Sequence, residues 1–292
     1  MLLLDLKKKY DFYLRNKFSK LEIEFFFKIL VKKYLQEDPI IILSKPETKI
    51  NKKKVEFFFS ALKDLKNNKP IQYILKEVYF CDKKFILNEF VLIPRPETEE
   101  LVYWFLENHN EKHFEKKILD IGTGSGCIPI TIKLKRSDWR VQSIDISEKC
   151  INLAKINAKK HSVEVNFQKR DILNIENWDN KLDYIISNPP YVAKFQKKDM
   201  DLNVLNYEPK SAIFVENDDP LIFYRNIIDF AERNLKKKGY LYVEINPLFC
   251  NDIKMLFERS NLEIKKIKKD FFEKKRFIKA KKNRWIFIKS EF

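Results

Sequence analysis

The fold is decided by the segment Lys117–Gly126, which reads KILDIGTGSG. Its first half predicts a short apolar strand. Three of the chain's four glycines lie within the next five positions, Gly122-Thr123-Gly124-Ser125-Gly126. Glycine tolerates positive φ and lets the backbone come close to a ligand, and an apolar helix to about Lys135 follows. This order of strand, glycine turn and helix indicates an adenosine cofactor, and the missing Gly-Lys-Ser/Thr ending excludes a Walker loop.

Carboxylates follow the next two expected strands. The strand Arg140–Ile144 ends at Asp145, where a carboxylate can accept both hydroxyls of a ribose. A further helix and strand lead to Asp171, which suits an adenine amino group, with Ile172 against the ring. Each aspartate alone is more often a turn or cap residue. Because ligands of open parallel sheets lie outside the carboxyl ends of the strands, glycine, Asp and Asp at three consecutive ends favour a cofactor site.

The fourth strand end carries Asn188-Pro189-Pro190-Tyr191, which closes the mostly apolar run Leu182–Ser187. Two prolines end the ladder, and Pro189 favours an extended backbone at Asn188. The Asn188 amide, a backbone carbonyl and the Tyr191 ring are thereby presented together. They can accept both hydrogens of a planar NH2 group while the ring packs on its face. The alternative is an Asn-Pro turn that only ends the strand.

The remaining chain predicts three parts. Residues 1–69 show apolar stripes at helical spacing and no catalytic constellation, which indicates a small helical domain suited to docking a substrate. Residues 70–96 change period, and Val78–Phe80 and Phe85–Leu87 predict a β-hairpin linker. Residues 97–292 form the expected catalytic domain.

Three further segments carry expectations. Arg95 stands between two prolines before a helix to about Asn108, so it is held rigidly and can help line a pocket. A helix over Pro220–Lys238 is expected to end at a capping Gly239. Beyond it, strands are expected at Tyr240–Ile245, Leu262–Lys268 and Arg284–Ile288, the last two joined by the basic segment around Lys274-Lys275-Arg276.

Composition excludes several classes of protein. No apolar run reaches the about 20 residues that a membrane span needs, and the first nine residues lack the order of a signal peptide. Four widely spaced cysteines and three histidines argue against a zinc or other metal site. Reduced thiols in the cytoplasm are the simplest account.

Positive charge is concentrated at both ends of the chain, whose net charge is +16. Residues 1–84 hold 20 Lys and Arg against 11 Asp and Glu, and residues 254–292 hold 14 against 5. Residues 85–253 hold 24 against 26, as in an ordinary enzyme. The ends can face an anionic partner, and a solvated lysine-rich surface from biased composition is the alternative.

From about Pro70 to its end, the chain resembles the N5-glutamine methyltransferases that modify class I peptide-chain release factors. The matching motifs stand in the family's order at Ile93–Thr98, Ile118–Gly126, Asn188–Tyr191 and Tyr207-Glu208-Pro209, followed by Leu221 and Tyr224-Arg225. Asn-Pro-Pro-Tyr alone would also suit nucleic-acid methyltransferases that act on adenine N6 or guanine N2. The proline-arginine-proline and Tyr-Glu-Pro segments favour glutamine as the methyl acceptor.

The resemblance implies a seven-stranded, Rossmann-like α/β methyltransferase domain that uses S-adenosylmethionine, with one antiparallel strand near the end and a small helical domain before it. It implies that Gly122–Gly126 hold the methionine part of the cofactor, Asp145 the ribose and Asp171-Ile172 the adenine. Asn188–Tyr191 would hold the glutamine of a release factor's Gly-Gly-Gln loop. Methyl transfer would leave S-adenosylhomocysteine as the product.

Within that resemblance, the Asn188 side-chain oxygen and the Pro189 carbonyl are the expected acceptors for the two hydrogens of the glutamine amide. The chain departs from the family at Asn246, where glycine is usual, and it lacks a glutamine shortly after. The basic ends give a second hypothesis, in which they steer docking onto an acidic release-factor surface or onto ribosomal RNA.

Two other classes of function stay open. A DNA methyltransferase would need a target-reading domain, and the chain has no sizeable insertion for one. A binding protein without activity, on a degenerate methyltransferase scaffold, is opposed by the intact glycine turn and by Asn188.

Overall fold

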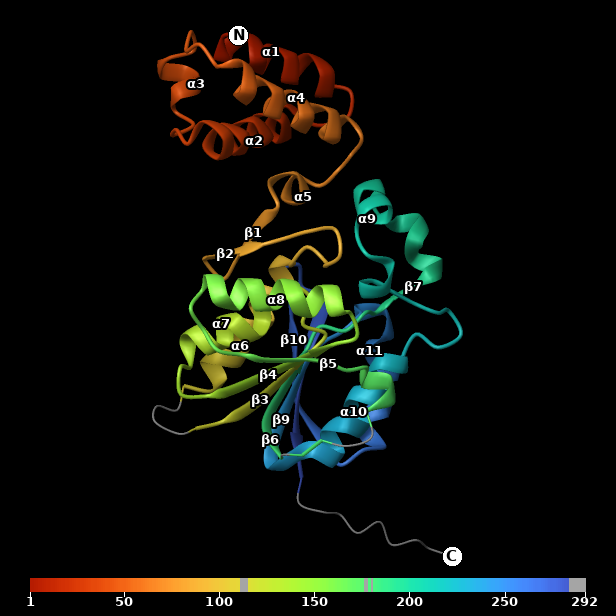
Figure 1. Ribbon diagram of the computed structural model, residues 1–292. Helices are drawn as coiled ribbons and strands as arrows, with labels where there is room; N and C mark the ends of the chain where they lie inside the picture. The colour runs from red at the N-terminus through yellow and green to blue at the C-terminus, as the bar shows by residue number, and fades with distance from the viewer. Residues whose placement is uncertain (111–114, 176–177, 180, 284–292) are drawn as a thin grey trace, which may run out of the picture. The chain divides into compact units, whose positions relative to one another are not determined.

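The computed structural model of the chain describes residues 1–110, 115–175, 178–179 and 181–283 (Figure 1). The chain forms two compact units. The first unit comprises Met1–Glu77 together with Asp201–Tyr207, and the second comprises Val78–Met200 and the chain from Glu208 onward. Each unit has its own hydrophobic core.

The first unit is helical. Its core gathers the inward-facing residues of three helices, among them Leu6, Phe27 and Phe58, and the Tyr10 hydroxyl donates to the Phe58 carbonyl oxygen at 2.6 Å. Phe59, the next residue in the chain, is 36% exposed. Its helices are α1 (Leu3–Leu14), α2 (Lys20–Leu30), the π-helix η1 (Val31–Leu35), α3 (Ile41–Ser44), α4 (Lys52–Lys66), α5 (Ile71–Leu75) and α9 (Leu202–Tyr207).

Polar side chains fix where two of these helices begin. The Ser19 hydroxyl accepts from the Glu22 amide, and the Glu22 carboxylate accepts from the Ser19 amide, so α2 starts with a reciprocal capping box. Asn51 caps α4 by accepting from the Lys54 amide at 2.9 Å. These caps satisfy amide groups that the first turn of a helix leaves without partners.

A two-stranded hairpin is formed by β1 (Glu77–Phe80) and β2 (Lys83–Ile86). Its turn is Cys81-Asp82 alone, with φ of 46° and 61°. Two consecutive residues with positive φ match the twist of a two-residue hairpin. The predicted hairpin therefore exists, with Lys83 and Lys84 in its second strand rather than in its turn.

The second unit is built on a seven-stranded sheet with the order β10-β11-β9-β6-β3-β4-β5. β11 pairs antiparallel with both of its neighbours, and every other pairing in the sheet is parallel. The predicted seven strands with one antiparallel strand near the end are confirmed. The strands are β3 (Lys117–Ile121), β4 (Arg140–Asp145), β5 (Asn166–Lys169), β6 (Leu182–Ser187), β9 (Leu235–Glu244), β10 (Leu262–Lys269) and β11 (Lys275–Lys282).

Helices cover both faces of this sheet, as Figure 1 shows. Alternate residues of β6 point to opposite faces: Tyr184 and Ile186 join one core cluster, and Ile185 joins the other. One face is covered by α6 (Pro96–Asn108), α7 (Cys127–Lys135) and α8 (Glu148–Lys160), and the other by α10 (Ile222–Asn234) and α11 (Cys250–Glu258). The result is a three-layer, doubly wound α/β unit.

Short elements complete the second unit after β5. They are the 3-10 helices η2 (Ile172–Asn174), η3 (Lys194–Asp199), η4 (Lys210–Ala212) and η5 (Pro247–Phe249), and the paired strands β7 (Val192–Ala193) and β8 (Phe214–Val215). Most of them lie in segments that follow a sheet strand at its carboxyl end.

Two expectations for the C-terminal part were wrong. α10 ends at Asn234, and Gly239 lies inside β9 rather than at a helix cap. A Cβ on Gly239 would meet the Asp183 and Lys236 carbonyl oxygens at 3.0 Å, so the glycine permits a close backbone approach at an irregular point of the β6–β9 pairing. The last strand of the sheet is formed by the basic segment itself, at Lys275–Lys282. The predicted strand Arg284–Ile288 lies outside the described residues.

Candidate active site

The carboxyl ends of β3, β4 and β6 bring the predicted motifs together. Ile121 is in register with both Ile144 and Ser187, so the residues that follow these three strands emerge side by side. The Asn188 carbonyl oxygen lies 3.7 Å from the position that a Cβ on Gly122 would occupy. Asn188 and the glycine turn are therefore neighbours, as the predicted site requires.

The glycine turn adopts the backbone that its sequence predicted. Gly122, Gly124 and Gly126 have φ of 83°, 52° and 82°. The Gly122 amide donates to the Ile144 carbonyl at 2.9 Å, which ties the turn to the end of β4. A Cβ on Gly124 would meet nothing within 4 Å, whereas one on Gly126 would lie 3.0 Å from the Ala154 Cβ in α8. Gly124 thus leaves room for a ligand, and Gly126 permits close helix packing.

Asp145 connects the glycine turn to the start of α8. Its carboxylate accepts from the amides of Gly124 and Ser147, both at 2.9 Å. Burial raises the pKa of this carboxyl group, and the two amide donors oppose the rise. Each carboxylate oxygen has a further lone pair, so the side chain can still accept from a ligand.

Beside the turn, the second unit contains a cavity of about 260 Å³. Seven of the predicted site residues line it: Gly122, Gly124, Asp145, Asp171, Ile172, Pro189 and Pro190. Other lining residues were not among the predicted site residues; they include Phe90, Val91, Leu92, Cys150, Phe223 and Ile227. The cavity therefore has a mostly apolar lining with two carboxylates, Asp145 and Asp171, as a nucleoside ligand requires.

Asp171 and Ile172 lie where the sequence placed them, after β5. Asp171 accepts from the Leu173 amide at 2.9 Å and from the Asn174 side-chain amide at 2.6 Å, so it also caps η2. The cap interpretation is confirmed, and capping also fixes a carboxylate that lines the cavity. Ile172 packs on the core below and presents a surface to the cavity.

Buried polar atoms under the turn supply an independent test of the cofactor assignment. Asp120 Oδ1, Thr123 Oγ1 and Ser125 Oγ are buried, and none of them has a hydrogen bond of ordinary geometry among the described residues, although the Thr123 hydroxyl lies near enough to the Asp120 carboxyl group to lower its pKa. Burial raises the pKa of Asp120 to about 7, and Ser143 donates to its other oxygen at 2.6 Å. Unpaired buried polar groups are rare and mark places where a ligand or water completes the structure. The residues at the turn therefore fit a cofactor with polar groups at one end.

Arg95 lies apart from the cavity in the part of the chain that the structure describes. Its guanidinium pairs with the Glu208 carboxylate at 2.7 Å, and the other oxygen of Glu208 accepts from the Ile93 amide at 3.2 Å. The Glu208 side chain is almost fully buried. The pair thus fastens the proline-arginine-proline segment to the Tyr-Glu-Pro segment, 113 positions along the chain.

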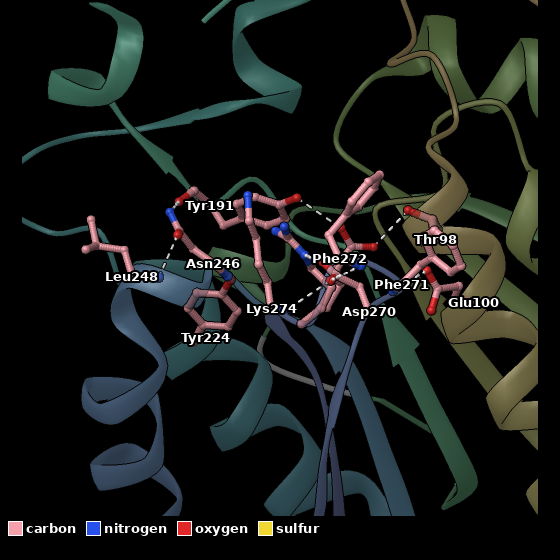
Figure 2. A network of polar contacts seen from close by, with 12 residues as sticks. Thr98, Glu100, Tyr191, Tyr224, Asn246, Leu248, Asp270, Phe271, Phe272 and Lys274 are labelled. Carbon is pink, nitrogen blue, oxygen red and sulfur yellow. Dashed lines mark hydrogen bonds and ion pairs between the residues drawn. The ribbon is translucent and has the colours of Figure 1, made fainter. Parts of the chain in front are cut away.

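A chain of hydrogen bonds supports the Asn-Pro-Pro-Tyr motif. Figure 2 shows its Thr98 and Tyr191 ends. The Asn188 side-chain amide donates to the Thr98 hydroxyl at 2.8 Å, and that hydroxyl donates to the Glu244 carboxylate at 2.8 Å. The Tyr191 hydroxyl donates to the other oxygen of Glu244 at 2.9 Å. One carboxylate at the end of β9 therefore anchors both ends of the motif.

The anchoring carboxylate titrates near neutrality. Glu244 is 1% exposed, and burial raises its pKa to about 7, against the opposing hydrogen bonds from Thr98 and Tyr191. Burial together with the nearby Glu244 charge holds the pKa of Tyr191 well above its usual value. Tyr191 is thus a neutral hydroxyl donor throughout the physiological range.

Asn246 fills the position where the family usually has glycine. Its φ of −71° is accessible to any residue, so no glycine is needed there. Its side-chain amide donates to the Tyr191 carbonyl and to the Gln196 side chain, each at 2.9 Å, and its own amide donates to the Tyr224 hydroxyl at 3.0 Å. Figure 2 shows Asn246 between Tyr191 and Tyr224, on the side of Tyr191 that faces away from Thr98.

We expect Asn246→Gly to lower the free energy of unfolding by about 1–3 kcal/mol, because the Tyr191 carbonyl and the Gln196 side chain lose a buried donor. Urea unfolding of the two proteins, followed by circular dichroism, measures the difference. A variant at least as stable as the parent would show that these hydrogen bonds make no net contribution to the free energy of unfolding.

Thr98 and Glu244 are the site residues that the sequence analysis missed. Thr98 lies in the segment Ile93–Thr98, at the start of the predicted helix, where only Arg95 was given a role. Glu244 offered one signal, since it is a carboxylate at the end of the strongly apolar stretch Tyr240–Ile245. A charge at the inner end of a buried strand is costly unless it is paired, which marks such a residue for attention.

Other expected features concern what the chain lacks. All four cysteines are buried and free. Over the ranges that the structure describes, no group of three or more His, Cys, Asp or Glu residues is arranged to hold a metal ion. Over the same ranges, no helix is both long enough and apolar enough to cross a membrane.

The class of protein follows from this geometry and from comparison with known proteins. Residues 102–207 match the family model of the methyltransferase small domain. The hMettl16 catalytic domain, solved in complex with the MAT2A 3'UTR hairpin 6, superposes with a TM-score of 0.50 at 15% identity, over 70% of this chain and 76% of that one. That likeness concerns the fold alone. The chain is an S-adenosylmethionine-dependent methyltransferase.

Comparison with curated relatives identifies the family within this class of methyltransferases. The release factor glutamine methyltransferase of Flavobacterium psychrophilum is 41% identical over 265 residues, which are 90% of this chain and 93% of the relative. That of Bacteroides thetaiotaomicron is 38% identical over 217 residues, 74% of this chain and 77% of the relative. The chain belongs to the release factor glutamine methyltransferase family.

Proposed function

We propose that this protein transfers a methyl group from S-adenosylmethionine to the side-chain amide nitrogen of the glutamine in the Gly-Gly-Gln motif of class I peptide-chain release factors. One observation carries the proposal: Asn188-Pro189-Pro190-Tyr191 stands beside the glycine turn, and Pro189 and Pro190 line the cavity that Asp145 and Asp171 also line. A methyl donor and a planar amide can meet there.

The lining of the cavity supports a proposed position for each part of the cofactor. Gly122–Gly126 and the unpaired polar atoms beneath them would hold the methionine part. Asp145 would accept from the ribose hydroxyls, and Asp171 from the adenine amino group, with Ile172 against the ring. When bound there, the cofactor supplies an electrophilic methyl group on a sulfonium.

Asn188 and Pro189 would orient the methyl acceptor. Because the Asn188 Nδ2 donates to Thr98, its Oδ1 is the atom left to accept a hydrogen from the glutamine amide. The Pro189 carbonyl would accept the second hydrogen, with Pro190 and Tyr191 supporting the acceptor from the side. An amide nitrogen is a weak nucleophile, and orientation alone can contribute up to about 7–11 kcal/mol in well-aligned systems.

The same two oxygens would stabilise the transition state. Positive charge develops on the glutamine nitrogen as the new bond forms. Two fixed oxygens that accept the hydrogens of this nitrogen lower the energy of the transition state. No strong base is required, because an alkylated, protonated amide loses its proton readily. Asn188 and Pro189 are therefore the catalytic residues that we propose.

The experiment is a methylation assay with labelled S-adenosylmethionine. Purified protein is incubated with a class I release factor, with the same factor carrying Gln→Ala in its Gly-Gly-Gln motif, or with DNA. Label only in the unaltered release factor supports the proposal. Label in DNA, or equal label in both release-factor forms, would contradict it.

The helical first unit and the two basic ends would serve docking. We propose that residues 1–69 dock the release factor and that the basic ends attract an acidic surface of it, or ribosomal RNA nearby. Acting on a release factor would also put the enzyme in the cytoplasm. Arg95 would act indirectly: its ion pair with Glu208 would fix the segment that leads into α6.

Electrostatic docking predicts a strong dependence on salt. Raising NaCl from 50 to 500 mM should slow association with the release factor by about tenfold or more, because exposed charges are screened over a few ångströms at high salt. Stopped-flow fluorescence with a labelled release factor measures the rate. A flat response would indicate that the lysines only solvate the surface.

A further inference from the structure

We propose that the buried carboxylate of Glu244, acting through the Thr98 hydroxyl, sets which way the Asn188 side-chain amide points. Thr98 and Glu244 are thus positioning residues for the methyl acceptor, and the direction of their hydrogen bonds acts as a switch. This inference rests on the proposed function, because it concerns the same acceptor site.

Three elements far apart in the sequence build this relay. Thr98 lies in the first turn of α6, Asn188 follows β6, and Glu244 ends β9. Thr98 is 3% exposed and Glu244 1% exposed, so neither has bulk water as an alternative partner. Both hydrogen bonds are 2.8 Å long. The three groups therefore constrain one another strongly.

Hydrogen-bond direction in this relay is decided at Glu244. An ionised carboxylate has no proton and can only accept, so the Thr98 hydroxyl must donate its single proton to it. The hydroxyl oxygen then faces Asn188 as an acceptor, and only the NH2 side of the Asn188 amide can meet it. Asn188 Oδ1 is thereby turned the other way, available to the glutamine.

Protonating Glu244 permits the reverse arrangement. A neutral carboxyl group can donate to the Thr98 oxygen, and the Thr98 hydroxyl then donates to Asn188 Oδ1. The Asn188 amide would rotate by about 180° and present two hydrogens where the glutamine amide also presents hydrogens. Two donors that face each other cannot form a hydrogen bond, so this form cannot hold the glutamine amide in a reactive geometry.

The surroundings of Glu244 fix the pH range of the switch. Glu97 in α6 disfavours its charge, and Arg276 in β11 favours it. Arg276 is itself paired with Asp270 at 3.0 Å, which reduces its effect on Glu244. Tyr191 and Tyr224, the tyrosines nearest to this carboxylate, stay neutral because burial raises the pKa of each.

The sign of the pH effect follows directly. Since the pKa of Glu244 is raised to about 7, the ionised and active form dominates above that pH and is lost as the pH falls. The single-turnover rate of methylation should therefore drop about tenfold per pH unit below about pH 7, as expected when one required group is protonated. The rate is measured at saturating cofactor, because the pKa of Asp120 beneath the glycine turn is also raised to about 7 and its protonation is expected to change cofactor affinity.

Three variants test the relay by single-turnover methylation of a release factor between pH 5.5 and 9. Thr98→Ser keeps the hydroxyl and should keep both the rate and the acid limb. Thr98→Val cannot relay, so its rate at pH 8.5 should be about 10- to 100-fold lower and its acid limb absent. Glu244→Gln cannot ionise and should also lack the acid limb, with a smaller loss of rate.

Binding of S-adenosylhomocysteine by calorimetry and thermal unfolding show that each variant is folded. Should Thr98→Val fail to fold, the profiles of the parent, Thr98→Ser and Glu244→Gln decide. An acid limb that persists in Glu244→Gln, or a parental rate in Thr98→Val, would overturn the relay. A parent protein that does not methylate the release factor at all would instead contradict the proposed function.

Discussion

Replacing Asn188 with alanine should lower the single-turnover rate of release-factor methylation by about 10²-fold or more, the loss typical of removing one preorganised group that stabilises a transition state. The side-chain oxygen that accepts from the glutamine amide is gone, and so is the group that Thr98 orients. Cofactor affinity should change less, because Asp145, Asp171 and the glycine turn are untouched. Single-turnover assays and calorimetric titration with S-adenosylhomocysteine separate the two effects.

Asn226→Ala is a matched control for that measurement. The Asn226 side chain donates to the Ile222 carbonyl within its own helix, and Asn226 is not among the described residues that line the cavity. Its rate should equal that of the parent. Unchanged activity in Asn188→Ala would remove Asn188 from the chemistry, and a large loss of cofactor binding would reassign it to the cofactor site.

The second large effect is expected at Gly126. An alanine there must hold φ near 82°, which costs about 1–2 kcal/mol, and must fit a Cβ 3.0 Å from two side-chain carbons, which costs about 1–3 kcal/mol more. Because the contacts include both the Cβ and the Cα of Ala154, α8 must shift, whereas the Ile130 Cδ1 is the end of a side chain that can turn away. We expect the free energy of unfolding to fall by about 2–5 kcal/mol, measured by urea unfolding.

Gly124→Ala provides the comparison within the same turn. Its φ of 52° carries a similar backbone cost, but a Cβ there meets nothing within 4 Å. Its stability should fall by only about 1–2 kcal/mol, while cofactor binding falls more, because the methyl group enters the space reserved for the ligand. Equal losses of stability in the two variants would show that packing against α8 does not distinguish these glycines.

Much of the site could be predicted because it lies at strand ends. The glycine turn, Asp145, Asp171 and Asn188 each follow a predicted strand, and open parallel sheets place such residues at a common edge. Pro189 and Pro190 marked the end of β6 for a local reason, since neither can continue a ladder. These signals need only a few neighbouring residues.

Errors arose where a local signal had two meanings. Gly239 was interpreted as a helix cap, yet it permits a close approach between β9 and the Asp183 carbonyl of the neighbouring strand. The basic segment from Lys275 was interpreted as a connection, yet it pairs with β9 and β10. Charged side chains favour exposure to solvent, but a strand can expose every second side chain on one face of the sheet and still pair with its neighbours.

The sequence by itself determined the class of fold, the glycine turn and the side chains at the strand ends, because φ preferences and apolar periodicity act between near neighbours. Only the tertiary structure decided what orients Asn188, since Thr98 is 90 positions away from it and Glu244 another 146 from Thr98. It also decided which residues wall the cavity, such as Phe90 and Phe223. Hydrogen-bond direction and burial belong to groups brought together by packing, and no local pattern records them.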